Sequence, residues 1–149
     1  MIRDREKALV SACLLGVACR YDGGHEYDRE VEVLRGKYDL VPVCPEQLGG
    51  LSTPRPAAEI RGGAGEEVLS GTARVETLEG DHEVTDAFLR GAEAALRIAG
   101  FTGARAAFLK SRSPSCGCGS IVVAGKEVKG DGVTTALLKR HGITVESWG

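Results

Sequence analysis

The fold is decided by the stretch Ala8-Leu9-Val10-Ser11-Ala12-Cys13-Leu14-Leu15, an apolar run that Gly16 closes. A continuous apolar run of this length, bounded by a turn signal, predicts a buried strand. The glycine-containing segment 19–24 that follows predicts a loop. Cys13 therefore lies near the carboxyl end of the first predicted strand, which makes that edge of the sheet a candidate site.

Three further strands are predicted along the chain. They cover Tyr38–Val43, Arg105–Leu109 and Ile143–Glu146. The first of these stops at Cys44, and the second leads into the polar loop 110–119. Pro42 has no amide hydrogen to give to a neighbouring strand, so it favours an edge position for its strand.

Helices are predicted between these strands. One covers Asp28–Leu34 with an Asp cap, one covers Glu83–Ile98 with a clear apolar stripe, and one covers Val133–His141, ended by Gly142. Hairpins are expected over 68–78 and 121–128. The stretch 46–65 is rich in Gly and Pro and predicts a long loop, a type that is usually functional or disordered.

Strands that alternate with helices indicate an α/β protein. We expect a small Rossmann-like three-layer fold with a mostly parallel sheet, helices on both faces and short β-hairpin insertions. The length of 149 residues suits a single domain, 1–149.

Composition narrows the class of protein. A formal net charge of -2 does not predict a nucleic-acid surface, and the mean hydropathy of -0.09 comes with no apolar run of membrane-spanning length. The charged segment 1–7 does not resemble a signal peptide, so a cytoplasmic protein is expected. Five cysteines in such a compartment favour metal ligands, reactive thiols or packing over disulfides.

Three of the cysteines should meet. Cys13, Cys44 and Cys116 each lie at or just after the end of a different predicted strand, and the carboxyl ends of parallel strands form one edge where ligands bind. Thiolates bind iron–sulfur clusters and zinc, and topology alone leaves both open. For any one of them, a buried core thiol is the alternative. Cys19 and Cys118 are left over, and their spacing matches no C-x2-C pair.

Two polar features accompany these cysteines. Glu46 lies two residues beyond Cys44 and can act as a general acid or base, or be a solvated loop carboxylate. The segment 110–117, with three serines and two cations, can bind a polar or anionic ligand, and Arg55 can point into the same cleft.

The chain resembles a bacterial family, the thiouracil desulfidases, formerly a domain of unknown function. The resemblance covers nearly the whole chain and lies in the segments 10–16, 20–23, 42–46, 49–51, 54–55, 109–117 and 130–134.

The resemblance implies a [4Fe-4S] cluster bound by Cys13, Cys44 and Cys116, with one iron not ligated by protein. That iron would take the sulfur of a small thiolated substrate, so that 2-thiouracil and water give uracil and hydrogen sulfide. The acidic catalyst of the family matches Glu46 and a catalytic serine matches Ser113. Ser111 and Lys110 are further candidates from their position, and a homodimer is one assembly to test.

Two other functions remain as alternatives. A non-catalytic zinc- or cluster-binding module would use the same cysteines without needing Glu46. A thiol-redox or sulfur-carrier protein would instead use the Cys116–Cys118 pair, which can exchange disulfides without a metal.

Overall fold

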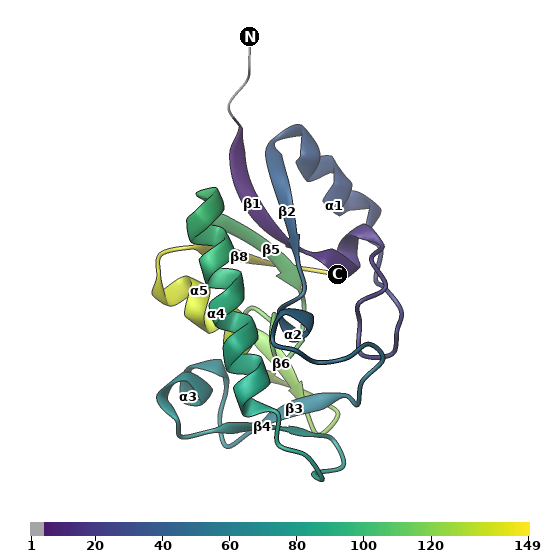
Figure 1. Cartoon of the computed structure of the whole chain (residues 1–149), viewed down its shortest axis with the longest axis vertical. Coiled ribbons are helices and arrows are strands. Elements are labelled where there is room, and N and C mark those ends of the chain that lie inside the picture. Colours follow the sequence, from purple (N-terminus) through teal and green to yellow (C-terminus); the bar gives the residue numbers. More distant parts are fainter. Residues whose placement is uncertain (1–4) are drawn as a thin grey trace.

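A parallel four-stranded sheet forms the centre of the structure, a computed structural model that describes residues 5–149. The strands lie in the order β2 (Tyr38–Val43), β1 (Glu6–Ser11), β5 (Ala106–Lys110) and β8 (Thr144–Trp148) (Figure 1). The predicted α/β fold is confirmed, and Pro42 lies on an edge strand as expected. Residues 1–4 of the charged N-terminal segment lie outside the described part.

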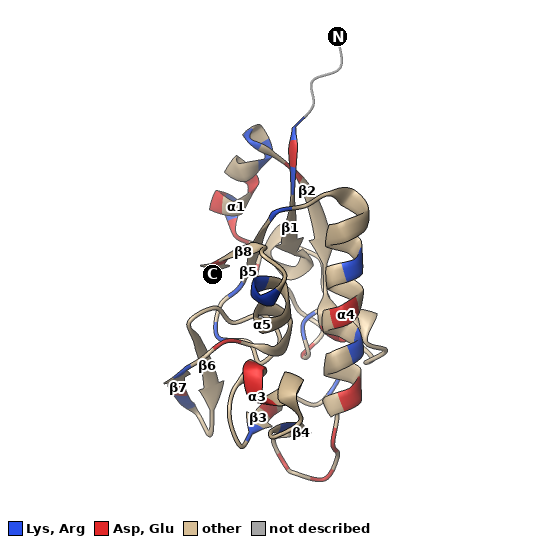
Figure 2. Cartoon of the chain, turned by 90° about the vertical axis from the view of Figure 1, so that its left-hand side faces the viewer, with Lys and Arg blue, Asp and Glu red and all other residues tan. Residues whose placement is uncertain are grey.

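Helices cover both faces of this sheet. Helix α1 (Arg29–Val33) covers one face, while α4 (Thr85–Thr102) and α5 (Val133–Arg140) pack together on the other (Figure 1). The alternation of side chains along β1 produces the two apolar layers: Ala8 and Val10 pack with the first face, and Leu9 packs with the second. Figure 2 shows that the charged residues of α4 alternate in sign along its length.

The first strand is shorter than the sequence suggested. It ends at Ser11, and residues Ala12–Leu15 form a 3-10 helix that Gly16 ends with a φ of 95°. Pairing of β1 with β5 stops at Val10 and pairing with β2 stops at Ser11, and the 3-10 helix begins at the next residue. Cys13 therefore lies just beyond the strand. A second short 3-10 helix, Leu34–Gly36, follows α1.

The predicted hairpin over 68–78 is wrong. Its second half is β4 (Arg74–Thr77), but the antiparallel partner is β3 (Ala58–Arg61), inside the stretch that was expected to be a loop. The residues between them form α3 (Gly65–Ser70). Glu67 stabilises the start of this helix, because its Oε1 accepts the Ala64 amide at 2.7 Å.

The hairpin expected near 121–128 is confirmed as β6 (Ser120–Val123) and β7 (Lys126–Lys129). The two antiparallel two-stranded sheets, β3–β4 and β6–β7, lie beyond the carboxyl end of the main sheet (Figure 1). No helix within residues 5–149 has the length and apolar character needed to cross a membrane.

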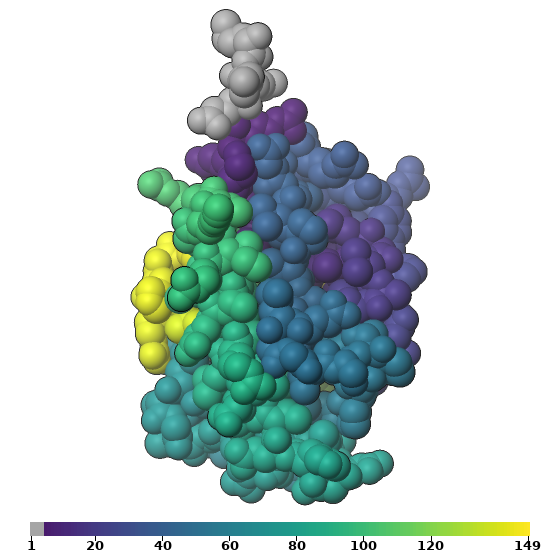
Figure 3. All heavy atoms as spheres, in the orientation of Figure 1, coloured from purple at the N-terminus to yellow at the C-terminus, as the bar shows by residue number. Residues whose placement is uncertain are grey.

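Two glycines allow α2 (Pro45–Leu48) to lie directly on α4. A Cβ added to Gly91 would lie 1.9 Å from the Pro45 carbonyl oxygen, and one added to Gly49 would lie 1.9 Å from the Ala87 carbonyl oxygen. In the space-filling view the segment after β2 packs against α4 (Figure 3). This backbone contact fixes the segment that follows β2.

We expect Gly91→Ala to destabilise the protein by about 1–3 kcal/mol, because the two backbones must move apart. Urea unfolding measures the change. Gly100→Ala is the matched control in the same helix, since a Cβ there meets nothing within 4 Å. That control should stabilise the protein by about 0.5–1 kcal/mol. Equal stability of Gly91→Ala and the wild type would show that the contact is not tight.

Candidate active site

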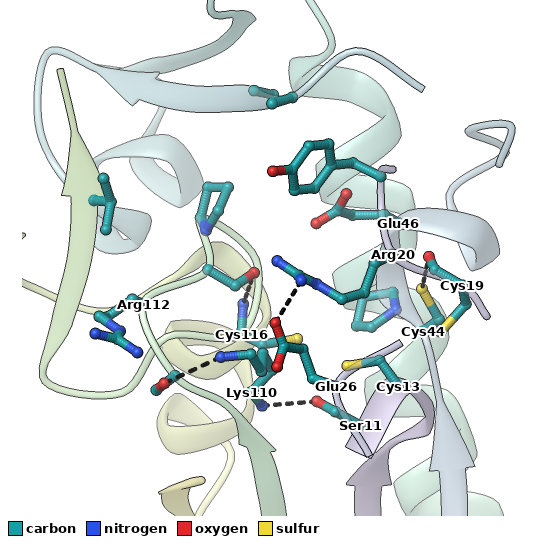
Figure 4. Close-up of a pocket in the computed structure, with 18 of the residues that line it drawn as sticks. Ser11, Cys13, Cys19, Arg20, Glu26, Cys44, Glu46, Lys110, Arg112 and Cys116 are labelled. Atoms are coloured by element: carbon teal, nitrogen blue, oxygen red, sulfur yellow. Dashed lines mark hydrogen bonds and ion pairs between the residues drawn. The ribbon is translucent and has the colours of Figure 1, made fainter. Parts of the chain in front are cut away.

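A cavity of about 460 Å³ opens at the carboxyl edge of the sheet. The segments after β1, β2 and β5 form its floor, and residues of β3 and of the β6–β7 hairpin contribute to its wall. All the side chains selected from the sequence line it: Cys13, Cys44, Glu46, Lys110, Ser111, Ser113 and Cys116. Figure 4 labels Cys13, Cys44, Glu46, Lys110 and Cys116 around the cavity.

Cys13 and Cys44 lie on the turns that directly follow their strands. Cys13 is 8% exposed in its 3-10 helix, and Cys44 is the residue before α2. A hydrogen bond from the Cys19 thiol lowers the pKa of the Cys13 thiol, despite burial, which acts in the opposite direction. Hydrogen bonding to Cys19 and burial raise the pKa of the Cys44 thiol. Cys13 is therefore the most readily ionised of the candidate ligands.

Cys116 is held by the start of α5. Thr135 Oγ1 donates to the Cys116 carbonyl oxygen at 2.8 Å, and a Cβ added to Gly132 would lie 2.8 Å from the Cys116 amide nitrogen. Ser113 Oγ accepts the amides of Ser115 and Cys116 at 3.1 Å each. Burial raises the pKa of the Cys116 thiol to about 12, so a metal that binds here displaces its proton.

Glu46 forms an ion pair that the sequence did not reveal. Arg55 Nε donates to Glu46 Oε2 at 2.8 Å, and the Arg55 side chain is only 6% exposed. The same guanidinium donates to the Cys19 carbonyl oxygen at 2.9 Å and to Thr53 Oγ1 at 2.9 Å. The carboxylate is thus fixed beside the cysteines rather than solvated in a loop.

Lys110 and Ser111 lie at the end of β5, where they share contacts with Gly149. Lys110 Nζ donates to the Gly149 carbonyl oxygen at 3.2 Å and Ser111 Oγ donates to it at 2.7 Å. Burial lowers the pKa of the Lys110 amine. Both side chains contact the cavity as well, so they can face a bound molecule.

Sequence reasoning gave no role in the site to several other lining residues, among them Ser11, Cys19, Arg20 and Glu26. In the sequence, Cys19 has no partner at a C-x2-C spacing, and Arg20 belongs to the predicted loop 19–24. That loop contains a turn, since the Gly23 amide donates to the Arg20 carbonyl oxygen, but the Arg20 side chain forms an ion pair with Glu26 at 2.5 Å in the cavity (Figure 4). The position of Cys19, six residues after Cys13, was the available signal.

Cys118 lies outside the cavity wall. Its thiol donates to the Val145 carbonyl oxygen at 3.5 Å, whereas Cys116 lines the cavity. The two thiols of the Cys-x-Cys pair therefore face different surroundings. This arrangement does not favour a dithiol site built from Cys116 and Cys118.

The thiols that line the cavity are donors of the kind that bind iron–sulfur clusters. Within residues 5–149, no three His, Cys, Asp or Glu side chains are grouped closely enough to bind one metal ion. A single zinc ion needs its ligands at about 2.0–2.3 Å from one centre. An iron–sulfur cluster bonds each cysteine to a different iron, so it needs thiols that surround a larger space. Cys13, Cys44 and Cys116 all line the one cavity, so the chemistry of the donor set fits such a cluster.

Three comparisons with known proteins each match most of the chain. A family model described as 2-thiouracil desulfurase matches residues 8–147. The uncharacterized protein YbbK of Bacillus subtilis is 47% identical over 142 residues, which is 93% of this chain and 93% of that protein. The solved structure of a 4Fe-4S-dependent thiouracil desulfidase, TudS, is 45% identical with a TM-score of 0.83, and the match covers 96% of this chain and 91% of that one.

Proposed function

The chain belongs to the 2-thiouracil desulfurase family, and from this premise we propose that it removes sulfur from a thiolated pyrimidine such as 2-thiouracil. The observation that carries the proposal is that the cavity is lined by four cysteines, three of which follow parallel strands, and by a fixed carboxylate, Glu46. Water supplies the new oxygen of uracil and the two protons of hydrogen sulfide. Thiouracil and water thus give uracil and hydrogen sulfide with no net electron transfer.

Cys13, Cys44 and Cys116 are the proposed ligands of a 4Fe-4S cluster. The similar TudS is described as 4Fe-4S-dependent, and thiolates are the usual ligands of such clusters. Three protein ligands leave one iron without a protein ligand. When bound, the cluster would supply at this iron a Lewis acid that accepts the soft sulfur of the substrate.

Glu46 is the proposed general base. Arg55 holds Oε2, and among residues 5–149 no hydrogen bond is made to Oε1, which can take a proton from the attacking water. A carboxylate held by a nearly buried guanidinium has little rotational freedom. The proton acceptor is therefore oriented before the substrate arrives.

Ser113, Ser111 and Lys110 are proposed to orient the pyrimidine. The oxygen of Ser113 already accepts two backbone amides, so its proton is available for an oxygen or nitrogen of the ring. Lys110 contributes a half-buried cation whose proton is held less tightly than that of an exposed lysine. Both groups can stabilise negative charge that develops on the ring.

The test is anaerobic purification followed by an assay. We expect a brown protein with a broad absorbance at about 400 nm and equal amounts of iron and acid-labile sulfide. Added 2-thiouracil should then yield uracil and sulfide in equal amounts, whereas added uracil should yield no sulfide. A colourless anaerobic protein that takes up no iron during reconstitution would refute the proposal.

A further inference from the structure

The loop that runs from Cys13 to Glu26 is fixed by its backbone. The Glu26 amide donates to the Cys13 carbonyl oxygen at 3.0 Å, so the two ends of the loop lie side by side. Within the loop, the Gly23 amide donates to the Arg20 carbonyl oxygen at 2.9 Å, and the Arg20 amide donates to the Gly24 carbonyl oxygen at 3.0 Å. Main-chain contacts therefore place Arg20 and Glu26 beside a proposed ligand, independently of their side chains.

The side chains of Arg20 and Glu26 form an ion pair in the cavity. Arg20 Nη1 donates to Glu26 Oε1 at 2.5 Å, and both residues line the cavity (Figure 4). The Arg20 guanidinium also lies over the Tyr21 ring, 5.4 Å from its centroid. The two side chains are 26% and 45% exposed, and an ion pair that water reaches contributes only about 0–1 kcal/mol to stability. The fold gains little from this pair, and both side chains remain available to a bound molecule.

Each member of the pair keeps hydrogen-bonding capacity that the described chain does not use. Within residues 5–149, Nε and Nη2 of Arg20 donate to no protein atom, and Oε2 of Glu26 accepts from none. A guanidinium can only donate hydrogen bonds, and an ionised carboxylate can only accept them. The pair therefore presents a donor beside an acceptor to a molecule in the cavity.

We propose that Arg20 and Glu26 determine substrate specificity by binding one edge of the pyrimidine ring. In 2-thiouracil the C4 carbonyl oxygen accepts and the adjacent N3–H donates, which matches Arg20 and Glu26 respectively. In 2-thiocytosine the same edge carries an amino group that donates and a ring nitrogen that accepts. Donor would then face donor and acceptor would face acceptor, and both sides would lose hydrogen bonds to water without replacement.

The inference rests on the proposed function and narrows its substrates to thiolated pyrimidines of the uracil type. The experiment compares 2-thiouracil with 2-thiocytosine, which carry sulfur on the same carbon. Sulfide release by the anaerobically reconstituted enzyme gives kcat/KM for each compound. We expect the wild type to prefer 2-thiouracil by at least about 100-fold, because a site built to hydrogen-bond one arrangement rejects the other.

Two variants change the hydrogen-bonding pattern of the pair. Glu26→Gln supplies an amide N–H for the ring nitrogen of 2-thiocytosine, and Arg20→Gln supplies an amide oxygen for its amino group. Each should lower the preference for 2-thiouracil by at least about tenfold. Glu66→Gln, in an exposed ion pair with Arg140, is the matched control and should keep the wild-type preference.

Isothermal titration calorimetry supplies a measurement that needs no reaction. The wild type should bind uracil more tightly than cytosine, since the two products differ at the same edge, and both variants should reduce that difference. Iron content and circular dichroism confirm that the cluster and the fold are intact. If one variant does not fold, the other decides the outcome.

An unchanged preference in the folded, cluster-loaded variants would overturn this inference and leave the proposed function standing. An equal loss of activity with both substrates would also overturn it, because such a loss identifies a role in the reaction or in the structure instead of in selection. A cluster-loaded wild type that releases no sulfide from either compound would overturn the proposed function. The affinities for uracil and cytosine would still test the inference in that case.

Discussion

Cys116→Ala should abolish both the bound iron and sulfide release, because the proposed cluster would lose one of three protein ligands. This cysteine is the most deeply placed of the three, and its loop is fixed to α5 through Thr135 and Gly132. Cys118, the thiol two residues away, donates to the Val145 carbonyl oxygen and is not among the residues that line the cavity.

The measurement is iron and sulfide content after anaerobic reconstitution, with folding checked by circular dichroism. Cys118→Ala is the matched control, two residues away and outside the cavity, and it should keep cluster and activity. The same pair tests the thiol-redox alternative. If Cys118→Ala loses all activity while Cys116→Ala still binds a full cluster, the proposed ligand set is wrong and a Cys-x-Cys mechanism is favoured.

The convergence of the cysteines was predictable because it depends on topology rather than on exact element boundaries. Cys13, Cys44 and Cys116 follow three parallel strands, and parallel strands present their carboxyl ends at one edge. The prediction that the three cysteines meet at one edge therefore holds although the predicted length of β1 was wrong. Its strand ends at Ser11, not Leu15, and Cys13 still lies at that edge.

Features that depend on side-chain packing were not predictable in the same way. The pairing of β3 with β4 joins residues on either side of α3, and nothing in the local pattern of 46–65 indicates a strand partner beyond a helix. The ion pair of Arg55 with Glu46 likewise depends on how the loop after α2 folds back. Gly91 carried no signal either, because its role is a contact with the Pro45 carbonyl oxygen.

Glu46→Gln should lower sulfide release by at least about 100-fold while the cluster stays bound, since general-base catalysis contributes about 10²–10⁴-fold. Glutamine keeps the size of the side chain and an oxygen for the Arg55 guanidinium, but it cannot accept the proton of water. Sulfide release and the absorbance of the cluster are measured on the same sample. Glu66→Gln, which alters an exposed ion pair with Arg140, is the control and should keep wild-type activity.

The same measurements, made on the wild type and on Glu46→Gln, distinguish an enzyme from a cluster-binding module. A wild-type protein that holds the cluster and releases no sulfide from any thiolated pyrimidine would favour the module. Unchanged activity in Glu46→Gln would instead show that another group takes the proton. Glu26 is the other carboxylate to test in that case, since it also lines the cavity.

Removing the charge of Glu46 also leaves Arg55, 6% exposed, without its anionic partner. A nearly buried charge that loses its partner is strongly destabilising, so a drop in activity can arise from a displaced guanidinium instead of a lost base. The double variant Glu46→Gln/Arg55→Met distinguishes the two causes. If the unpaired guanidinium is responsible, removing it restores activity. If Glu46 is the base, the double variant recovers stability in urea unfolding but remains at least about 100-fold less active than the wild type.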